Sequence, residues 1–184
     1  MMKKTFAALT ALLAVSSLAA GTLADFSNGM GCVYTTGSVN AYETAPVVAV
    51  VEDAKAPGGH ALLAKIAGVK EGSKFGRYDV VVKLKPEEAA KIREISFDVK
   101  VSGRKSFGWS VIYFFKARRI PDIRSRSIPG KDFKIGEWQH FTFPVDSFKA
   151  EGKGIEMNEA RIFVISFFTY APVEIAVANI AYAE

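Results

Sequence analysis

The chain has 184 residues, of which 49% are hydrophobic and 23% are charged, a balance that is typical of one globular domain. A domain of this length buries enough surface to fold without a metal ion or a disulfide as a staple. Cys32 is the only cysteine, so an internal disulfide is excluded, and we expect a small buried side chain near the first strand.

Residues 1–24 have the features of a secretory signal peptide. They begin with two lysines, continue with an apolar run at residues 6–15 that is too short to span a membrane, and end with the small residues of Thr22-Leu23-Ala24. We expect cleavage before Asp25 or a few residues earlier. Residues 25–184 then form one β-sandwich domain that is secreted or periplasmic. An uncleaved anchor is the alternative; no later stretch is long and apolar enough to cross a membrane.

Removal of this leader takes away two lysines and no acidic residue, so the formal net charge falls from +5 to +3. This is a mild excess, unlike the clustered positive charge of a nucleic-acid-binding protein, and no nucleic-acid partner is expected. Export of a chain without disulfides indicates a bacterial envelope protein or a secreted protein.

Short segments with a strand-like pattern follow one another along the mature chain, with turn signals between them. Residues 86–93 are the one good helical segment, about two turns long, and no regular alternation of strands and helices occurs. The sequence therefore predicts an all-β fold, an antiparallel two-sheet β-sandwich (jelly roll) of about eight to ten strands with one short connector helix. We expect the strands at residues 33–42, 46–51, 60–67, 78–84, 95–101, 107–116, 138–144, 161–170 and 174–182.

One stretch of the chain carries a recognisable pattern. Residues 136–148 read Gly-Glu-Trp-Gln-His-Phe-Thr-Phe-Pro-Val-Asp-Ser-Phe, in which Phe141 and Phe143 share one face of a strand while His140 and Thr142 share the other. This stretch resembles the late-strand signature of the galactose-binding-like β-jelly-roll domains. That group includes many non-catalytic carbohydrate-binding modules and the complex I intermediate-associated protein family. The resemblance implies the fold, whereas a function must be argued from a site because one fold hosts many functions.

Many domains of this kind hold a structural calcium ion between their opening segment and their last strand. The opening segment and the last strand of this chain lack two of the usual calcium ligands. Ser27 stands where an acid is usual, and Ala178 has no side-chain oxygen. Calcium takes about six to eight oxygen ligands, and only Asp25 and Asn179 match the usual ligand positions. We therefore expect no metal ion and no other cofactor.

The sequence contains no pattern that carries a catalytic mechanism. Its two histidines, His60 and His140, fall in different strands, and no zinc-protease, nucleophile-elbow or phosphate-loop motif occurs. Glycosidase carboxylates meet only in space, so a glycan-active enzyme stays open as an alternative. The expectation is a protein that is not an enzyme.

A sugar-binding face is the more specific hypothesis, because sugars bind to flat aromatic rings flanked by planar polar groups. Trp109 and Tyr113 share one face of the strand expected at residues 107–116 and are candidates to line a groove; the alternative is that this face is core. His140 is a candidate for the exposed face of its strand. Trp138 is expected to be a packed anchor under a loop.

Four arginines form a second candidate group, within a segment that we expect to be a long exposed loop with room for a short strand. The planar fork of arginine matches carboxylate and sulfate groups, which favours an anionic polysaccharide as ligand; an ordinary solvated loop is the alternative. The sequence thus predicts an exported, non-catalytic domain whose partner is a polysaccharide or another glycan. The runner-up is a protein-interaction or envelope-assembly domain that binds another envelope protein. The arginines are Arg118, Arg119, Arg124 and Arg126.

Overall fold

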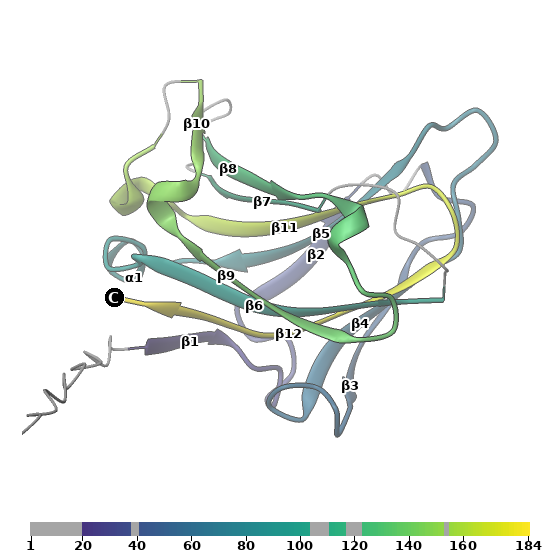
Figure 1. Cartoon of the computed structure of the whole chain (residues 1–184), viewed down its shortest axis with the longest axis horizontal. Coiled ribbons are helices and arrows are strands. Elements are labelled where there is room, and N and C mark those ends of the chain that lie inside the picture. Colours follow the sequence, from purple (N-terminus) through teal and green to yellow (C-terminus); the bar gives the residue numbers. More distant parts are fainter. Residues whose placement is uncertain (1–19, 38–40, 104–110, 117–122, 153–154) are drawn as a thin grey trace, which may run out of the picture.

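The chain folds into two antiparallel sheets that pack face to face (Figure 1). The computed structural model describes residues 20–37, 41–103, 111–116, 123–152 and 155–184. Each sheet has six strands in this part of the chain, which confirms the predicted two-sheet β-sandwich. The strand count exceeds the expected number because β1 (Ala20–Ala24) and β10 (Lys149–Glu151) were not predicted as strands, while β8 (Ile123–Ile128) is the short strand for which the predicted loop left room.

Sheet A has the strand order β3-β4-β12-β6-β9, and β1 pairs with β12 off this path. Sheet B has the order β10-β8-β7-β11-β5-β2. The strands of sheet A are β1 (Ala20–Ala24), β3 (Val47–Glu52), β4 (His60–Ile66), β6 (Glu94–Ser102), β9 (Trp138–Pro144) and β12 (Val173–Ala183). Those of sheet B are β2 (Val33–Gly37), β5 (Gly76–Lys83), β7 (Val111–Lys116), β8 (Ile123–Ile128), β10 (Lys149–Glu151) and β11 (Ile162–Thr169).

The expected connector helix is present as α1 (Pro86–Ala89), which joins β5 of one sheet to β6 of the other. Pro86 occupies the first turn, where its missing N–H costs nothing, and Glu87 and Glu88 face the positive end of the helix dipole. Among the described residues, 3-10 turns lie at Gly130–Asp132, Val145–Ser147 and Met157–Glu159. No helix within the described ranges is long and apolar enough to cross a membrane.

The core lies between the sheets and is built from alternate residues of the strands. Phe97 of β6, Phe115 of β7 and Phe163 of β11 meet at its centre and are fully buried. The ring centroid of Phe163 lies 6.1 Å from that of Phe97 and 5.1 Å from that of Phe115, so this side chain joins the two sheets. In β6 the period of two in the sequence correctly predicts which residues face inward, whereas the sequences of β7 and β11 are apolar on both faces and do not.

Tyr78 of β5 is a buried exception among these apolar side chains. Its hydroxyl oxygen has no hydrogen-bond partner among the described residues, and burial raises the pKa of the phenol above its ordinary value. A raised folded-state pKa means that the stabilising contribution is present below the unfolded-state pKa of about 10 and is lost as the pH rises above it. The free energy of unfolding should therefore fall as the pH rises above about 10.

We expect the variant Tyr78→Phe to be at least as stable as the wild type at pH 7, because it removes an unsatisfied buried hydroxyl. Its stability should also decline less between pH 9 and about pH 11. Urea unfolding across this pH range measures both effects. Tyr34→Phe is the matched control, since Tyr34 is 39% exposed and should change neither quantity. A Tyr78→Phe variant that is much less stable at pH 7 would contradict the unsatisfied hydroxyl.

Candidate functional site

A polar triplet lies at the centre of the outer face of sheet B, with a buried aspartate and serine and a partly exposed arginine. The Arg77 guanidinium makes a bidentate contact with the Asp79 carboxylate: Nε donates to Oδ1 at 2.8 Å and Nη2 lies 2.7 Å from Oδ2. Ser166 of the neighbouring strand β11 donates its hydroxyl to the same Oδ1 at 2.6 Å. The Asp79 side chain is only 4% exposed, whereas that of Arg77 is 41% exposed. The carboxylate thus fixes the guanidinium on a side chain that as a whole stays partly exposed.

Aromatic rings surround this triplet on the same face. Tyr34 of β2 pairs in register with Val81, one position along the face from Asp79, and is 39% exposed. Phe168 pairs with Arg77 across the β11–β5 ladder, and its ring meets that of Phe75 edge to face at 5.4 Å. Exposed rings beside a fixed planar ion pair are the groups that sugar binding requires. We name this surface the sheet B face; it comprises Tyr34, Phe75, Arg77, Asp79, Ser166 and Phe168.

Three of the sequence-predicted ligand residues, Tyr113, Arg124 and Arg126, lie on the described strands β7 and β8 of sheet B. The backbone of Tyr113 pairs with Ile165 on one side and with Arg126 on the other. Trp109, Arg118 and Arg119 lie outside the described residues. The role assigned to these residues therefore stays a prediction.

Arg124 and Arg126 lie on β8, which is the short strand within the segment expected to be a long loop. Their side chains have separate contacts. Arg124 donates from Nε to the backbone oxygen of Ile155 at 2.7 Å, and the Arg126 guanidinium lies over the Phe143 ring at 4.7 Å from its centroid. Arg126 therefore covers the open edge of the core, where a cation on an aromatic face is favourable.

Arg124 also lines a cleft of about 520 Å³ at one end of the sandwich. Arg93 lines the same cleft and donates from Nη1 to the backbone oxygen of Ala90 at 3.0 Å. Each guanidinium is thus held by a carbonyl group and keeps further N–H donors for a ligand. The side chains of Asp146, Glu156 and Asn158 add hydroxyl-binding groups to the same walls. A hydroxylated ligand with an acidic group would match this lining.

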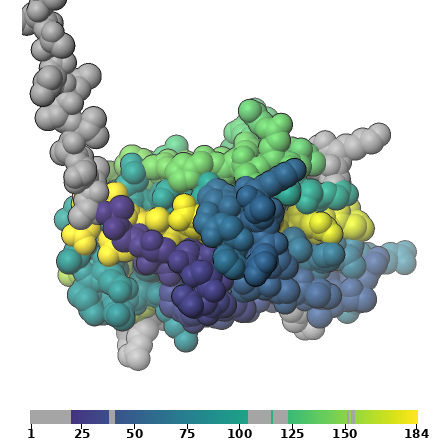
Figure 2. Space-filling model, turned by 90° about the horizontal axis from the view of Figure 1, so that it is seen from below, coloured from purple at the N-terminus to yellow at the C-terminus, as the bar shows by residue number. Residues whose placement is uncertain are grey.

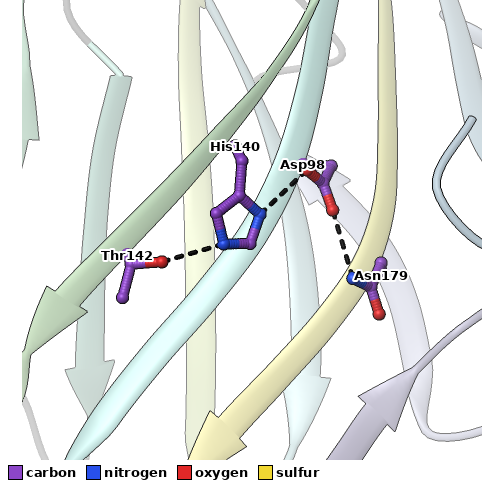
Figure 3. Close-up of polar contacts among 4 residues, drawn as sticks. All are labelled: Asp98, His140, Thr142 and Asn179. Atoms are coloured by element: carbon purple, nitrogen blue, oxygen red, sulfur yellow. Dashed lines mark hydrogen bonds and ion pairs between the residues drawn. The ribbon is translucent and has the colours of Figure 1, made fainter. Parts of the chain in front are cut away.

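His140 belongs to a different surface, the outer face of sheet A, where it joins a polar network across three strands (Figure 3). Its Nδ1 lies 2.9 Å from Asp98 Oδ1, and its Nε2 lies 2.9 Å from the Thr142 hydroxyl. Asn179 donates from Nδ2 to Asp98 Oδ2 at 3.2 Å. Both ring nitrogens are therefore engaged, and the half-exposed imidazole is held in one orientation.

Asn179 and Asp25, the two positions that match the calcium site of the resembling domains, have other partners. Asn179 has a positive φ of 45° at the bulge of β12, which turns its amide toward Asp98. The Asp25 carboxylate accepts hydrogen bonds from the backbone N–H and the hydroxyl of Ser27, and these bonds lower its pKa. Within the described ranges, no group of three or more His, Cys, Asp and Glu side chains could hold a metal ion.

Trp138 begins β9 and packs against a small alanine cluster on the outer face of sheet A, as expected for an anchor under a loop. The turn between β3 and β4 covers this alanine cluster. Figure 2 shows the turn in blue over the yellow strand β12. Asp53 of this turn approaches Lys100 of β6 at 3.9 Å. The turn therefore closes part of this face and leaves the surface around His140 open. The cluster comprises Ala56, Ala61, Ala176 and Ala178.

The chain is similar to known proteins in its three-dimensional structure but not in its sequence. No protein-family model matches the chain, and no curated protein is similar to it in sequence. The family 11 carbohydrate-binding module from Clostridium thermocellum, solved with a β-1,3-1,4-mixed-linked tetrasaccharide, superposes with a TM-score of 0.65 at 15% identity. That match covers 91% of this chain and 97% of the module.

Two further modules give the same result. A family 61 module solved with β-1,4-galactotriose has a TM-score of 0.53 at 13% identity and covers 89% of this chain and 99% of its own. The family 30 module of a Clostridium thermocellum cellulosomal cellulase has a TM-score of 0.55 at 13% identity, covering 83% and 92%. The predicted resemblance to the jelly-roll folds of carbohydrate-binding modules is confirmed at the level of the fold.

The sequence did not predict the sheet B face, because the aromatic residues are concentrated in the second half of the chain whereas Tyr34, Arg77 and Asp79 lie in the first half. One signal was available. In residues 77–83 the alternation places Arg77, Asp79 and Lys83 on the face opposite to the apolar Tyr78 and Val80. An arginine and an aspartate two positions apart on one strand face can form an ion pair. Tyr34 and Ser166 could be added only after the strand pairing was known.

Proposed function

We propose that this chain is an exported, non-catalytic carbohydrate-binding domain that holds a glycan on the sheet B face. The observation that carries the proposal is the Arg77–Asp79–Ser166 triplet beside exposed aromatic rings. The fold shared with modules that were solved in complex with oligosaccharides supports it.

The mechanism divides between rings and polar groups. A sugar ring stacks its C–H face on Tyr34 or on the Phe75–Phe168 pair, while the Arg77 side chain, which is 41% exposed, approaches the hydroxyl oxygens. Because Asp79 already fixes the guanidinium, little side-chain entropy is lost on binding. Trp109, which precedes β7 in the sequence, is a further candidate for stacking. Tyr113 pairs in register with the buried Ile165 and so does not belong to the sheet B face.

The same proposal includes preference for an anionic polysaccharide. Arg124 and Arg93 would bind a carboxylate or sulfate in their cleft, while the acidic and amide groups there accept and donate hydrogen bonds to sugar hydroxyls. Arg118, Arg119 and Arg126 of the same hairpin would add positive charge along the glycan. His140 would contribute a separate contact on sheet A.

The test is a screen of the exported protein against neutral and acidic glycans, followed by titration calorimetry with the best ligand. We expect Tyr34→Ala to weaken binding about tenfold, the loss of one stacking contact worth about 1.4 kcal/mol. Val47→Ala is the control, since Val47 is 67% exposed on sheet A and should not change binding. If no glycan binds, the proposal fails, and a protein partner in the envelope becomes the better hypothesis.

A separate experiment tests the proposed preference for an anionic polysaccharide. With a uronate oligosaccharide, Arg124→Ala should reduce affinity at low salt and reduce its dependence on salt, because one charge contact is lost. Lys131→Ala removes an equal charge from an exposed position outside the cleft and serves as the control. Equal losses in both variants would show only a general effect of net charge and would refute the Arg124 contact.

A further inference from the structure

The strand β1 is an integral part of sheet A, although it lies within the expected leader. It pairs antiparallel with the end of β12 through four register pairs: Ala20 with Ala183, Gly21 with Tyr182, Thr22 with Ala181 and Ala24 with Ile180. The strand thus continues the sheet on the side of β12 where β4 pairs farther along. In Figure 1 it lies beside β12, next to the C-terminus.

Side-chain packing fixes β1 as firmly as its backbone ladder does. Gly21 lies directly against the Tyr182 ring, so a Cβ atom there would come within 2.3 Å of ring carbon Cε1. Leu23 and Ala24 pack against the main core, and the Cys32 thiol donates to the backbone oxygen of Leu23 at 3.2 Å. Residues 20–24 therefore meet the folded domain through a ladder, a shape-specific glycine contact and core burial.

Cleavage before Asp25 would remove all of these contacts. Residues Ile180 to Ala183 would then become an open strand edge, which is a liability for aggregation. The Tyr182 ring and the core beside Leu23 would lose their cover. Cleavage before residue 20 would leave β1 in the mature protein and keep these contacts.

We infer that the leader is cleaved between Ala19 and Ala20, so that the mature protein begins with β1. Ser17 and Ala19 supply the small residues that a signal peptidase reads at the third and first positions before the cut. This processing site rests on the proposed export of the chain. It assigns residues 20–24 to the folded domain and shortens the leader to 19 residues.

The experiment is expression of the full 184-residue chain in an exporting bacterial host, with recovery of the protein from the periplasm or medium. N-terminal sequencing and intact mass identify the first residue, which we expect to be Ala20. An exported protein that begins at Asp25, or at any residue after Ala20, overturns the inference while the proposed export stands. An uncleaved chain in the cytoplasm overturns both.

A second measurement tests the reason for the site. Gly21→Val in the full chain should lower the melting temperature of the exported protein by at least about 5 °C, because its side chain collides with Tyr182. Thr22→Val is the matched control, since Thr22 is exposed on the same strand and should change it little. Equal melting temperatures for Gly21→Val and wild type would show that β1 is not part of the exported fold.

Discussion

Replacement of Arg77 by alanine is expected to abolish glycan binding and to lower the free energy of unfolding by about 2–3 kcal/mol. The two losses have different causes. Binding fails because the guanidinium that Asp79 orients is gone. Stability falls because the Asp79 carboxylate, only 4% exposed, keeps the Ser166 hydroxyl but loses both guanidinium contacts. Since Arg77 is itself 41% exposed, the figure of about 3–5 kcal/mol for breaking a fully buried pair is an upper limit.

The double variant Arg77→Ala with Asp79→Ala separates these causes. Removing both partners leaves no buried unpaired charge, so much of the stability should return, while glycan binding should stay lost. Urea unfolding and calorimetric titration of the four proteins of this cycle measure both quantities. Normal binding by the double variant would refute a glycan site on the sheet B face. Wild-type stability of the single variant would refute the role of the ion pair.

The largest effect on stability is expected from Phe163→Ala, at about 3–5 kcal/mol. Phe163 is fully buried and its ring contacts Phe97 of sheet A and Phe115 of sheet B, so its loss opens a cavity between the layers. Domains are stable by only about 5–15 kcal/mol, and the melting temperature should fall by about 10 °C.

Calorimetric melting of Phe163→Ala beside Val47→Ala checks this expectation. Val47 is 67% exposed, so its truncation removes little packing and should change the free energy of unfolding by less than about 0.5 kcal/mol. Similar losses in the two variants would mean that Phe163 does not join the sheets as described.

The layers of this fold could be predicted from sequence because a period of two is a local property. In β6, the apolar Ile95, Phe97 and Val99 face the core, as their alternation predicts. The strands that were not predicted, or for which a predicted loop only left room, are those without such alternation. β8 reads Ile-Arg-Ser-Arg-Ser-Ile, which is polar in its middle, and it exists because β7 and β10 pair with it on either side.

Local alternation also fails to predict the contacts of the polar sites. Alternation correctly places Asp98 on the outer face of sheet A, but outward direction does not imply exposure. The carboxylate is buried between His140 and Asn179, which come from strands distant in the chain. The Asp79–Ser166 contact likewise joins residues 87 positions apart. Pairings of this kind depend on strand order, which no local pattern encodes.

The position of β3 has a consequence for handling this protein. β3 is the outermost strand of sheet A in the described part of the chain, and Val47, Ala49 and Val51 alternate along it with little polarity to guard the edge. An outer strand with free N–H and C=O groups is a template on which another extended chain can add. When many copies bind to one polymer, their β3 edges would come close together. A lysine in place of Ala49 would then prevent β3 strands of neighbouring copies from pairing.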